Sequence, residues 1–306
     1  MRKRIIVLLM VLVFTMAFAA CGSNSQTESV DNNDEQAELV DNNDEQAENN
    51  DGNIGKMTDK ETSADSFLYV ENGNGGITIR AYKGQDTEVV IPETIDGKPV
   101  TEISEKAFSE NESVTGVRIP QSVENIGEEA FYDCEQLKTL LFSDKKMGSL
   151  TIGDKAFYLS PIENDLIINA NELNLGWQVF GFNKSKEVAL LADMLNLTDD
   201  LFPYNEAECI FIPKESVVTF QEKFINTEGA NIFSDMEQLS TAILPGCMSF
   251  IDETTFEGDA LVEVYTVEGS ETAESTKSVA IPLNTKDYEK VYKEHEQKYK
   301  KLGYDF

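Results

Sequence analysis

The stretch that decides the fold is IPQSVENIGEEAFYDCEQLKTLLF, residues 119–142, because its pattern returns along the chain at nearly constant spacing. The recurring unit is a hexamer that starts with an apolar residue, continues with a small polar residue or glycine, and ends with phenylalanine. Hexamers occupy residues 103–108, 126–131, 152–157, 175–180, 197–202 and 251–256, with a degraded copy at 232–233. Successive phenylalanines are 23, 26, 23, 22, 31 and 23 residues apart, which is the period of a leucine-rich solenoid.

Each hexamer predicts a short helical turn whose phenylalanine faces the core. Its second position always holds a residue type found at helix N-caps, namely Ser104, Gly127, Gly153, Gly176, Thr198 and Asp252. The phenylalanine follows about one turn later, so that it faces inward. We therefore expect a stacked structural spine made of Phe108, Phe131, Phe157, Phe180, Phe202, Phe233 and Phe256.

Short alternating apolar runs between the hexamers predict one short strand per coil, as at residues 117–119, 140–142, 210–212 and 262–264. A proline follows many of these runs, at Pro92, Pro120, Pro213, Pro245 and Pro282. Because proline has no amide to donate, it ends the ladder and turns the chain. The predicted fold is a right-handed α/β solenoid in one elongated domain.

The chain is predicted to divide into five segments. Residues 1–20 read as a secretory signal, since basic residues precede an apolar run and small residues. Residues 21–66 are expected to be a lipidated cysteine and a disordered acidic tether, because residues 22–66 hold 13 acidic and 2 basic residues and few large apolar ones. An N-terminal β cap at 67–91, the solenoid at 92–283 and a C-terminal amphipathic helix at 284–306 complete the division. We expect that helix to seal the open end; a basic, tyrosine-bearing contact for an anionic membrane or partner is the alternative.

The end of the signal resembles a bacterial lipobox, Phe18-Ala19-Ala20-Cys21, although Phe18 departs from the usual Leu, Val or Ile. The resemblance implies that Cys21 is diacylated, and two acyl chains would suffice for stable anchoring. An ordinary cleaved signal is the alternative, and a membrane span is disfavoured because the apolar run is short. The predicted location is extracytoplasmic, with a lipid anchor in the bacterial cell membrane at the cell surface.

The run TEVVIPETIDGKPVTEISEKAF, residues 87–108, together with the opening stretch, is similar to the first repeats of BspA-like leucine-rich-repeat surface proteins. The similarity covers about residues 67–282 and is loose from 160 to 210. It implies an exported solenoid with a binding role at the cell surface, and adhesion to host proteins in some members. No catalytic residue belongs to the family motif, so none is carried over.

The sequence offers few residues for a catalytic or metal-binding site. The single histidine, His295, lies on the expected C-terminal helix, so neither a catalytic triad nor a histidine-based metal site is expected inside the solenoid. Cys134, Cys209 and Cys247 share no repeat position, and we expect each to be a buried thiol that packs as a small apolar residue. One disulfide between two of them is the alternative. We expect no enzyme, cofactor or metal. The net charge of −31 also argues against nucleic acid as a partner.

The predicted function is that of an adhesin or receptor, a monomer that binds a protein or glycan. A structural or accessory envelope protein without a soluble ligand is the alternative. We expect the ligand to contact an exposed apolar stripe on the outward side of the strands, at Leu141, Ile167, Leu190, Phe211, Ile243 and Tyr265. Two alternatives remain open: a register shift in the middle coils, or a helical segment after Ser216 that folds over the sheet.

Overall fold

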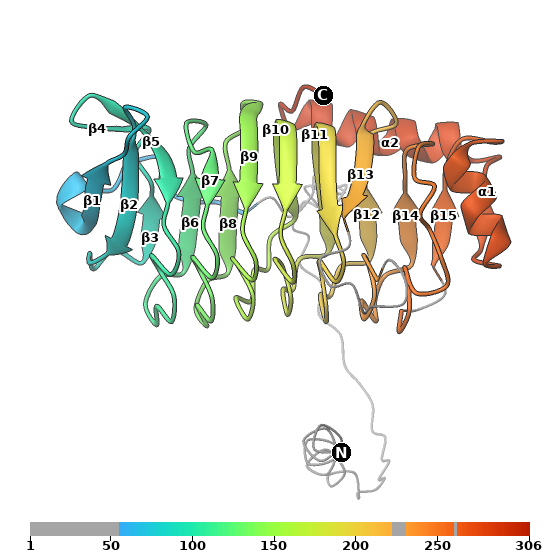
Figure 1. Cartoon of the computed structure of the whole chain (residues 1–306), viewed down its shortest axis with the longest axis horizontal. Coiled ribbons are helices and arrows are strands. Elements are labelled where there is room, and N and C mark those ends of the chain that lie inside the picture. The colour runs from blue at the N-terminus through green and yellow to red at the C-terminus, as the bar shows by residue number, and fades with distance from the viewer. Residues whose placement is uncertain (1–54, 222–230, 260–261) are drawn as a thin grey trace, which may run out of the picture. The chain divides into compact units, whose positions relative to one another are not determined.

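The computed structural model describes residues 55–221, 231–259 and 262–306, all within one compact unit. Coil after coil stacks along the long axis of this unit (Figure 1). The predicted leucine-rich-repeat solenoid is therefore confirmed. The signal, Cys21 and most of the tether lie outside the described residues.

Most coils hold two strand segments, one before the turn that prolines mark and one after it; the last three coils hold only the first in the residues that the structure describes. We call them leading and trailing strands. The leading strands are β3 (Glu88–Val90), β6 (Gly116–Ile119), β8 (Thr139–Phe142), β12 (Cys209–Phe211), β14 (Thr241–Ile243), β15 (Glu263–Tyr265) and β16 (Leu283–Asn284). The trailing strands are β2 (Ile77–Tyr82), β5 (Lys98–Ile103), β7 (Asn125–Ile126), β9 (Met147–Ile152) and β13 (Val217–Gln221). The leading strands are the predicted ones, whereas the trailing strands were not foreseen.

Two long strands, β10 (Leu166–Leu175) and β11 (Glu187–Thr198), run through both positions. Trailing segments pair in parallel in the order β2, β5, β7, β9, β10, β11 and β13. Leading segments pair in parallel as β3–β6–β8 and as β10–β11–β12–β14–β15–β16. At the N-terminal end β1 (Phe67–Glu71) pairs antiparallel with β2, and β4 (Thr94–Ile95) pairs antiparallel with β5. These antiparallel pairs form the N-terminal β cap.

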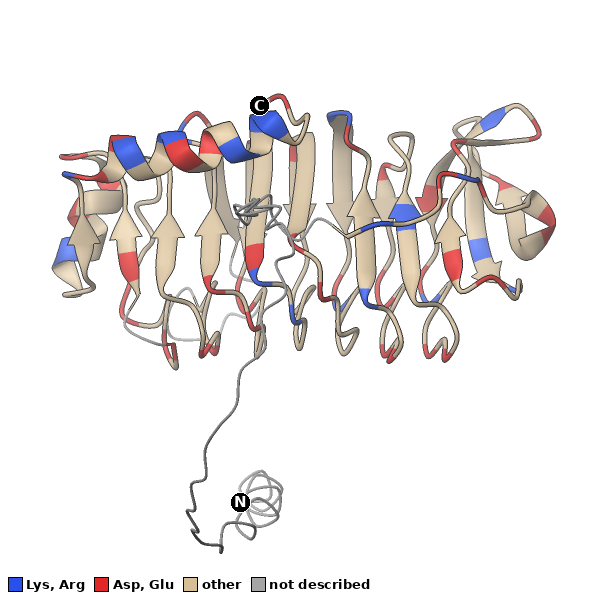
Figure 2. Ribbon diagram, turned by 180° about the vertical axis from the view of Figure 1, so that it is seen from behind, with Lys and Arg blue, Asp and Glu red and all other residues tan. Residues whose placement is uncertain are grey.

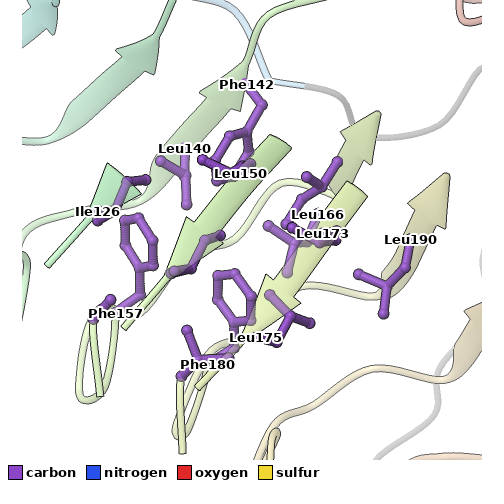
Figure 3. Close-up of a cluster of buried hydrophobic side chains, with 14 of the residues drawn as sticks. Ile126, Leu140, Phe142, Leu150, Phe157, Leu166, Leu173, Leu175, Phe180 and Leu190 are labelled. Atoms are coloured by element: carbon purple, nitrogen blue, oxygen red, sulfur yellow. The ribbon is translucent and has the colours of Figure 1, made fainter. Parts of the chain in front are cut away.

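The core lies inside the coils and is filled by the apolar residues of both strand positions and the hexamers. Figure 3 shows Ile126, Leu140, Leu173 and the rings of Phe157 and Phe180 in this interior. The seven hexamer phenylalanines form one stack, in which neighbouring ring centroids are 4.6 to 6.2 Å apart. Removal of an inner ring therefore takes one stacking contact from each of the two rings beside it.

The hexamers form tight turns and not the short helices that their second positions predicted. Their fourth residue adopts a left-handed conformation, with φ of 53 to 58° at Lys106, Glu129, Lys155, Gln178 and Asp200. A Cβ atom on Gly127 would lie 2.4 Å from the backbone nitrogen of Glu105 in the preceding coil. Glycine is thus required there by the close approach of stacked coils and not by helix capping.

The C-terminal helical cap is confirmed and contains two helices. The first, α1 (Glu271–Ser278), was not foreseen; its N-cap Ser270 accepts a hydrogen bond from the amide of Ala273. The second, α2 (Tyr288–Lys301), does not lie across the end of the solenoid, so the expectation that this helix seals the open end is wrong. It runs along the outside of the leading strands (Figure 2). Neither helix in the described part of the chain is long and apolar enough to span a membrane.

Ser216 is followed by a trailing strand, β13, where Val217, Phe220 and Phe224 had suggested a helix. Val218 faces the core, and the strand pairs in parallel with β11. Strand pairing with the neighbouring coil therefore outweighed the apolar spacing. Phe224 lies outside the described residues.

Candidate binding surface

The solenoid has two outward sheet faces, which differ in what lies on them. The outward side chains of the leading strands form what we call the leading face, and those of the trailing strands form the trailing face. Side chains alternate along each strand, so the residues between them point into the core. The two faces have to be considered separately as candidate sites.

The leading face is covered by α2 over the C-terminal coils. Strand register places one outward row at Ile167, Ala189, Phe211, Ile243, Tyr265 and Asn284. The centre of this row is Phe211, whose ring centroid lies 5.5 Å from that of Tyr292 and 5.2 Å from that of Tyr299. His295 stacks on the same ring at 5.8 Å. The aromatic side of α2 thus closes this apolar row.

The prediction of an exposed apolar stripe is therefore wrong. Ile167, Phe211 and Ile243 do point away from the core, but they are buried together with the tyrosines of α2. Leu190 points into the core, as Figure 3 shows, and Ala189 takes the outward position. Leu141 and Tyr265 are half-buried. Removing such an apolar row from water stabilises the folded chain, and α2 supplies the apolar surface that covers the row.

Polar contacts at both ends hold α2 in place. The Lys298 ammonium lies between two carboxylates, Glu187 and Asp165, with 3.4 Å to Asp165. Burial lowers the pKa of Lys298, but the two carboxylates raise it overall, so the ammonium stays charged. The Tyr299 hydroxyl also donates to Glu187, and the Tyr292 hydroxyl donates to Glu215 at 3.1 Å. These contacts fix the position of α2 along the leading strands, in addition to its apolar packing on them.

The N-terminal part of the leading face is bordered by residues 55–62. The amide of Thr62 donates to the carbonyl of Val90 at 2.9 Å, and Arg118 pairs with Asp59 at 3.0 Å. A hollow of about 670 Å³ remains between this segment and the C-terminal residues, lined by Arg118, Leu141 and Tyr304 among others. Little of the leading face is therefore free for a large ligand.

In the part of the chain that the structure describes, the trailing face is polar and largely accessible. One outward row carries an amide, hydroxyl or carboxylate in seven consecutive coils, at Thr78, Glu102, Asn125, Thr151, Asn174, Asn196 and Thr219. We call this row the polar ladder; Thr78 is buried, and the other members are half-buried or exposed. Hydrogen bonds join neighbours along it: the Asn196 amide donates to Asn174 at 2.6 Å, and Asn174 donates to Thr151 at 3.5 Å. These hydrogen bonds fix the side chains relative to one another.

A second outward row lies beside the polar ladder on the same face. It consists of Ser149, Glu172, Met194 and Val217, paired by the same strand register. Met194 is 49% exposed and Val217 is 58% exposed. Two uncovered apolar side chains beside a hydrogen-bonding array form a surface of mixed character, which is common at binding sites.

Sequence reasoning missed the polar ladder, although the repeat contains a signal for it. The residue directly before each of the first five hexamers is polar: Glu102, Asn125, Thr151, Asn174 and Asn196. This position points outward because the following hexamer residue points inward. A polar residue that recurs at one outward repeat position could have identified the face.

The three cysteines of the described region are free thiols. Cys134 is buried, as expected, and burial raises its pKa to about 11. Cys209 is half-buried and lies under α2, where its sulfur is 3.7 Å from Nε2 of His295. The expectation that Cys209 is a simple apolar filler is therefore wrong.

The comparisons with known proteins give one match to a family model and several distant structures. Residues 101–227 match the model of the BspA type leucine rich repeat region in six copies. A T. pallidum leucine rich repeat protein is 22% identical, with 69% of this chain and 87% of that chain covered and a TM-score of 0.44. A leucine rich cell surface protein from Faecalibacterium prausnitzii is 21% identical, with 61% and 55% covered and a TM-score of 0.38. No curated protein matches the chain.

Proposed function

Because the chain carries a BspA-type leucine-rich-repeat region, a fold typical of binding and scaffold proteins, we propose that it is a lipid-anchored extracytoplasmic binding protein. Its ligand is a protein or a glycan at the cell surface, as for an adhesin or receptor. The membrane contact is the lipid on Cys21. The observation that carries the proposal is the polar ladder of the trailing face, which is accessible from Glu102 to Thr219 among the described residues.

The chemistry of the ladder favours a ligand rich in hydrogen-bonding groups. Asparagine amides both donate and accept, threonine hydroxyls do the same, and Glu102 accepts, as does Glu172 in the neighbouring row. An array of such groups matches the hydroxyls of a glycan or the polar atoms of a protein surface. The neighbouring Met194 and Val217 would contact the apolar parts of that ligand. The leading face is a poorer candidate because the chain's own helix already occupies it.

Binding through the ladder is expected to weaken when two of its amides are removed together. The Cys21→Ala chain, which would carry no lipid, is purified and applied to glycan and protein arrays to find a ligand. Adding Asn174→Ala and Asn196→Ala should then lower affinity about 5- to 100-fold, because each lost hydrogen bond contributes about 0.5–1.5 kcal/mol. Binding is measured by calorimetry or surface plasmon resonance.

The matched control is Gln297→Ala, which removes an exposed amide from α2 on the other side of the solenoid. It should bind as the parent chain does. Equal affinities for the parent and the double variant would remove the ladder from the binding site. Failure to bind any array component, with co-purification of envelope proteins alone, would instead support the scaffold function.

The lipid anchor is tested separately by Cys21→Ala in cells. We expect the variant to leave the membrane fraction, because the acyl chains would be its principal attachment. Fractionation and immunoblotting measure the distribution, and Cys247→Ala, which changes a half-buried thiol of the solenoid, serves as the control. Retention of Cys21→Ala in the membrane fraction would place the anchor elsewhere.

A further inference from the structure

Three possible metal ligands from three separate elements meet beneath α2. Glu187 is the first residue of β11, Cys209 is the first residue of β12, and His295 lies in the middle of α2. One ligand atom from each lies within 4.8 Å of the other two. Strand register puts Glu187 directly beside Cys209, so these two ligands are fixed by the sheet and the third is brought by the helix.

The imidazole of His295 is held in the tautomer that a metal would need. Its Nδ1 lies 2.9 Å from the carbonyl oxygen of Val291. A carbonyl oxygen can only accept, so Nδ1 carries the hydrogen and donates it. Nε2 is then left with a lone pair, and it is Nε2 that lies 3.7 Å from the sulfur of Cys209. A second hydrogen bond from the ligating ring to a carbonyl is the usual support of a metal-bound histidine.

We propose that Glu187, Cys209 and His295 bind a borderline divalent metal ion, Zn²⁺ being the best match, and that the ion fastens α2 to the sheet. One thiolate, one imidazole and one carboxylate form a donor set suited to zinc, with a fourth position for water. Ligand bonds of about 2.3 Å to sulfur and about 2.0 Å to nitrogen in a tetrahedron separate the two atoms by about 3.5 Å. The 3.7 Å between Cys209 Sγ and His295 Nε2 is close to this value. Calcium and magnesium are poor matches because they avoid thiolates.

Two groups compete with the ion for Glu187. The Lys298 ammonium and the Tyr299 hydroxyl both bind its carboxylate. Lys298 also pairs with Asp165, so it keeps a buried partner when Glu187 turns to the metal. The Cys209 thiol gives up its proton when the ion binds, because a metal takes the thiolate. Binding thus exchanges that proton and the contacts of Glu187 with Lys298 and Tyr299 for three metal bonds.

The test is a titration of the purified full chain with Co²⁺, a spectroscopic substitute for Zn²⁺, followed by Zn²⁺ displacement. We expect one equivalent to give the near-ultraviolet charge-transfer band of a cobalt–thiolate bond and the visible bands of a tetrahedral ion. Cys209→Ser should abolish the charge-transfer band. His295→Gln should lower Zn²⁺ affinity more than about 100-fold, since loss of even a supporting group costs about 10- to 100-fold. Cys247→Ser, which changes another half-buried thiol, should titrate as the parent does.

A change that removes the competitor distinguishes this site from adventitious binding. Lys298→Met keeps much of the side chain but lacks the ammonium, so Zn²⁺ affinity should rise at least about tenfold if Glu187 is a ligand. Zn²⁺ should also slow amide exchange across residues 288–301 in the parent chain and not in His295→Gln. A cobalt spectrum that survives Cys209→Ser, or an affinity that Lys298→Met leaves unchanged or lowers, would overturn the proposal.

Discussion

Replacing Phe131 with alanine is expected to lower the free energy of unfolding by about 3–5 kcal/mol, the usual cost of truncating a buried phenylalanine. The ring is fully buried in the spine, with centroid distances of 4.6 Å to Phe108 and 5.0 Å to Phe157. Its removal leaves a cavity between two coils that the tight hexamer turns cannot close. Urea unfolding followed by circular dichroism measures the effect.

The change should also reduce cooperativity between the two parts of the solenoid. Each coil is stabilised mainly by its neighbours. A weakened contact in one coil therefore lowers the coupling between the coils on either side of it, so that they unfold less cooperatively. The control is Tyr204→Ala, which removes a ring that is 53% exposed at another hexamer turn. A Phe131→Ala chain whose stability equals that of the control would mean that the spine does not hold the coils together.

Replacing Phe211 with aspartate is expected to release α2 from the sheet. The side chain is buried at the centre of the apolar contact with Tyr292 and Tyr299. Loss of the ring alone costs about 3–5 kcal/mol, and an unpaired carboxylate buried in its place adds to that cost. A single helix held by one apolar row detaches more easily than the solenoid unfolds. We therefore expect the coils to stay folded.

Amide exchange and limited proteolysis detect this release. Residues 288–301 should lose their protection, while β5, β7 and β9 keep theirs. The matched control is Val217→Asp, the same kind of change on the open trailing face, which should leave α2 protected. If Phe211→Asp protects α2 as well as the control does, the contact between α2 and the sheet does not depend on this row.

The repeat period was sufficient to predict the coil, the spine and the leading strands. Each of these features depends on contacts between equivalent positions of neighbouring coils. The recurrence of the same residue types in the sequence therefore predicts them. Prolines such as Pro120 marked where a leading strand ends. The outward placement of Phe211 and Ile243 followed from the alternation of side chains along a strand, and the structure agrees with it.

Other features could not be predicted, for different physical reasons. In β11, residues 188–192 are all apolar, so no polar residue showed that Ala189 and not Leu190 points outward. The covering of the leading face depends on a helix that is distant in sequence, and its amphipathic pattern does not say which surface it contacts. Glu187, Cys209 and His295 lie far apart in the chain and form no local motif. Only the three-dimensional arrangement brings them together.

The two faces therefore have different roles in this account. The leading face is closed by α2, which makes the apolar row part of a second core. The trailing face stays open and supplies the polar ladder together with Met194 and Val217. A ligand that binds the solenoid should then protect the trailing face and leave the contacts of α2 unchanged.

Hydroxyl-radical footprinting of the native chain, read by mass spectrometry, tests this division most directly. Each rate is compared with that of the same residue in the unfolded chain, which removes differences in intrinsic reactivity. We expect Met194, which is 49% exposed, to keep a large part of its unfolded rate, whereas Phe211, Tyr292 and Tyr299 are strongly protected. Protection of Met194 together with rapid modification of Phe211 and Tyr292 would contradict it, because the leading face would then be the open one.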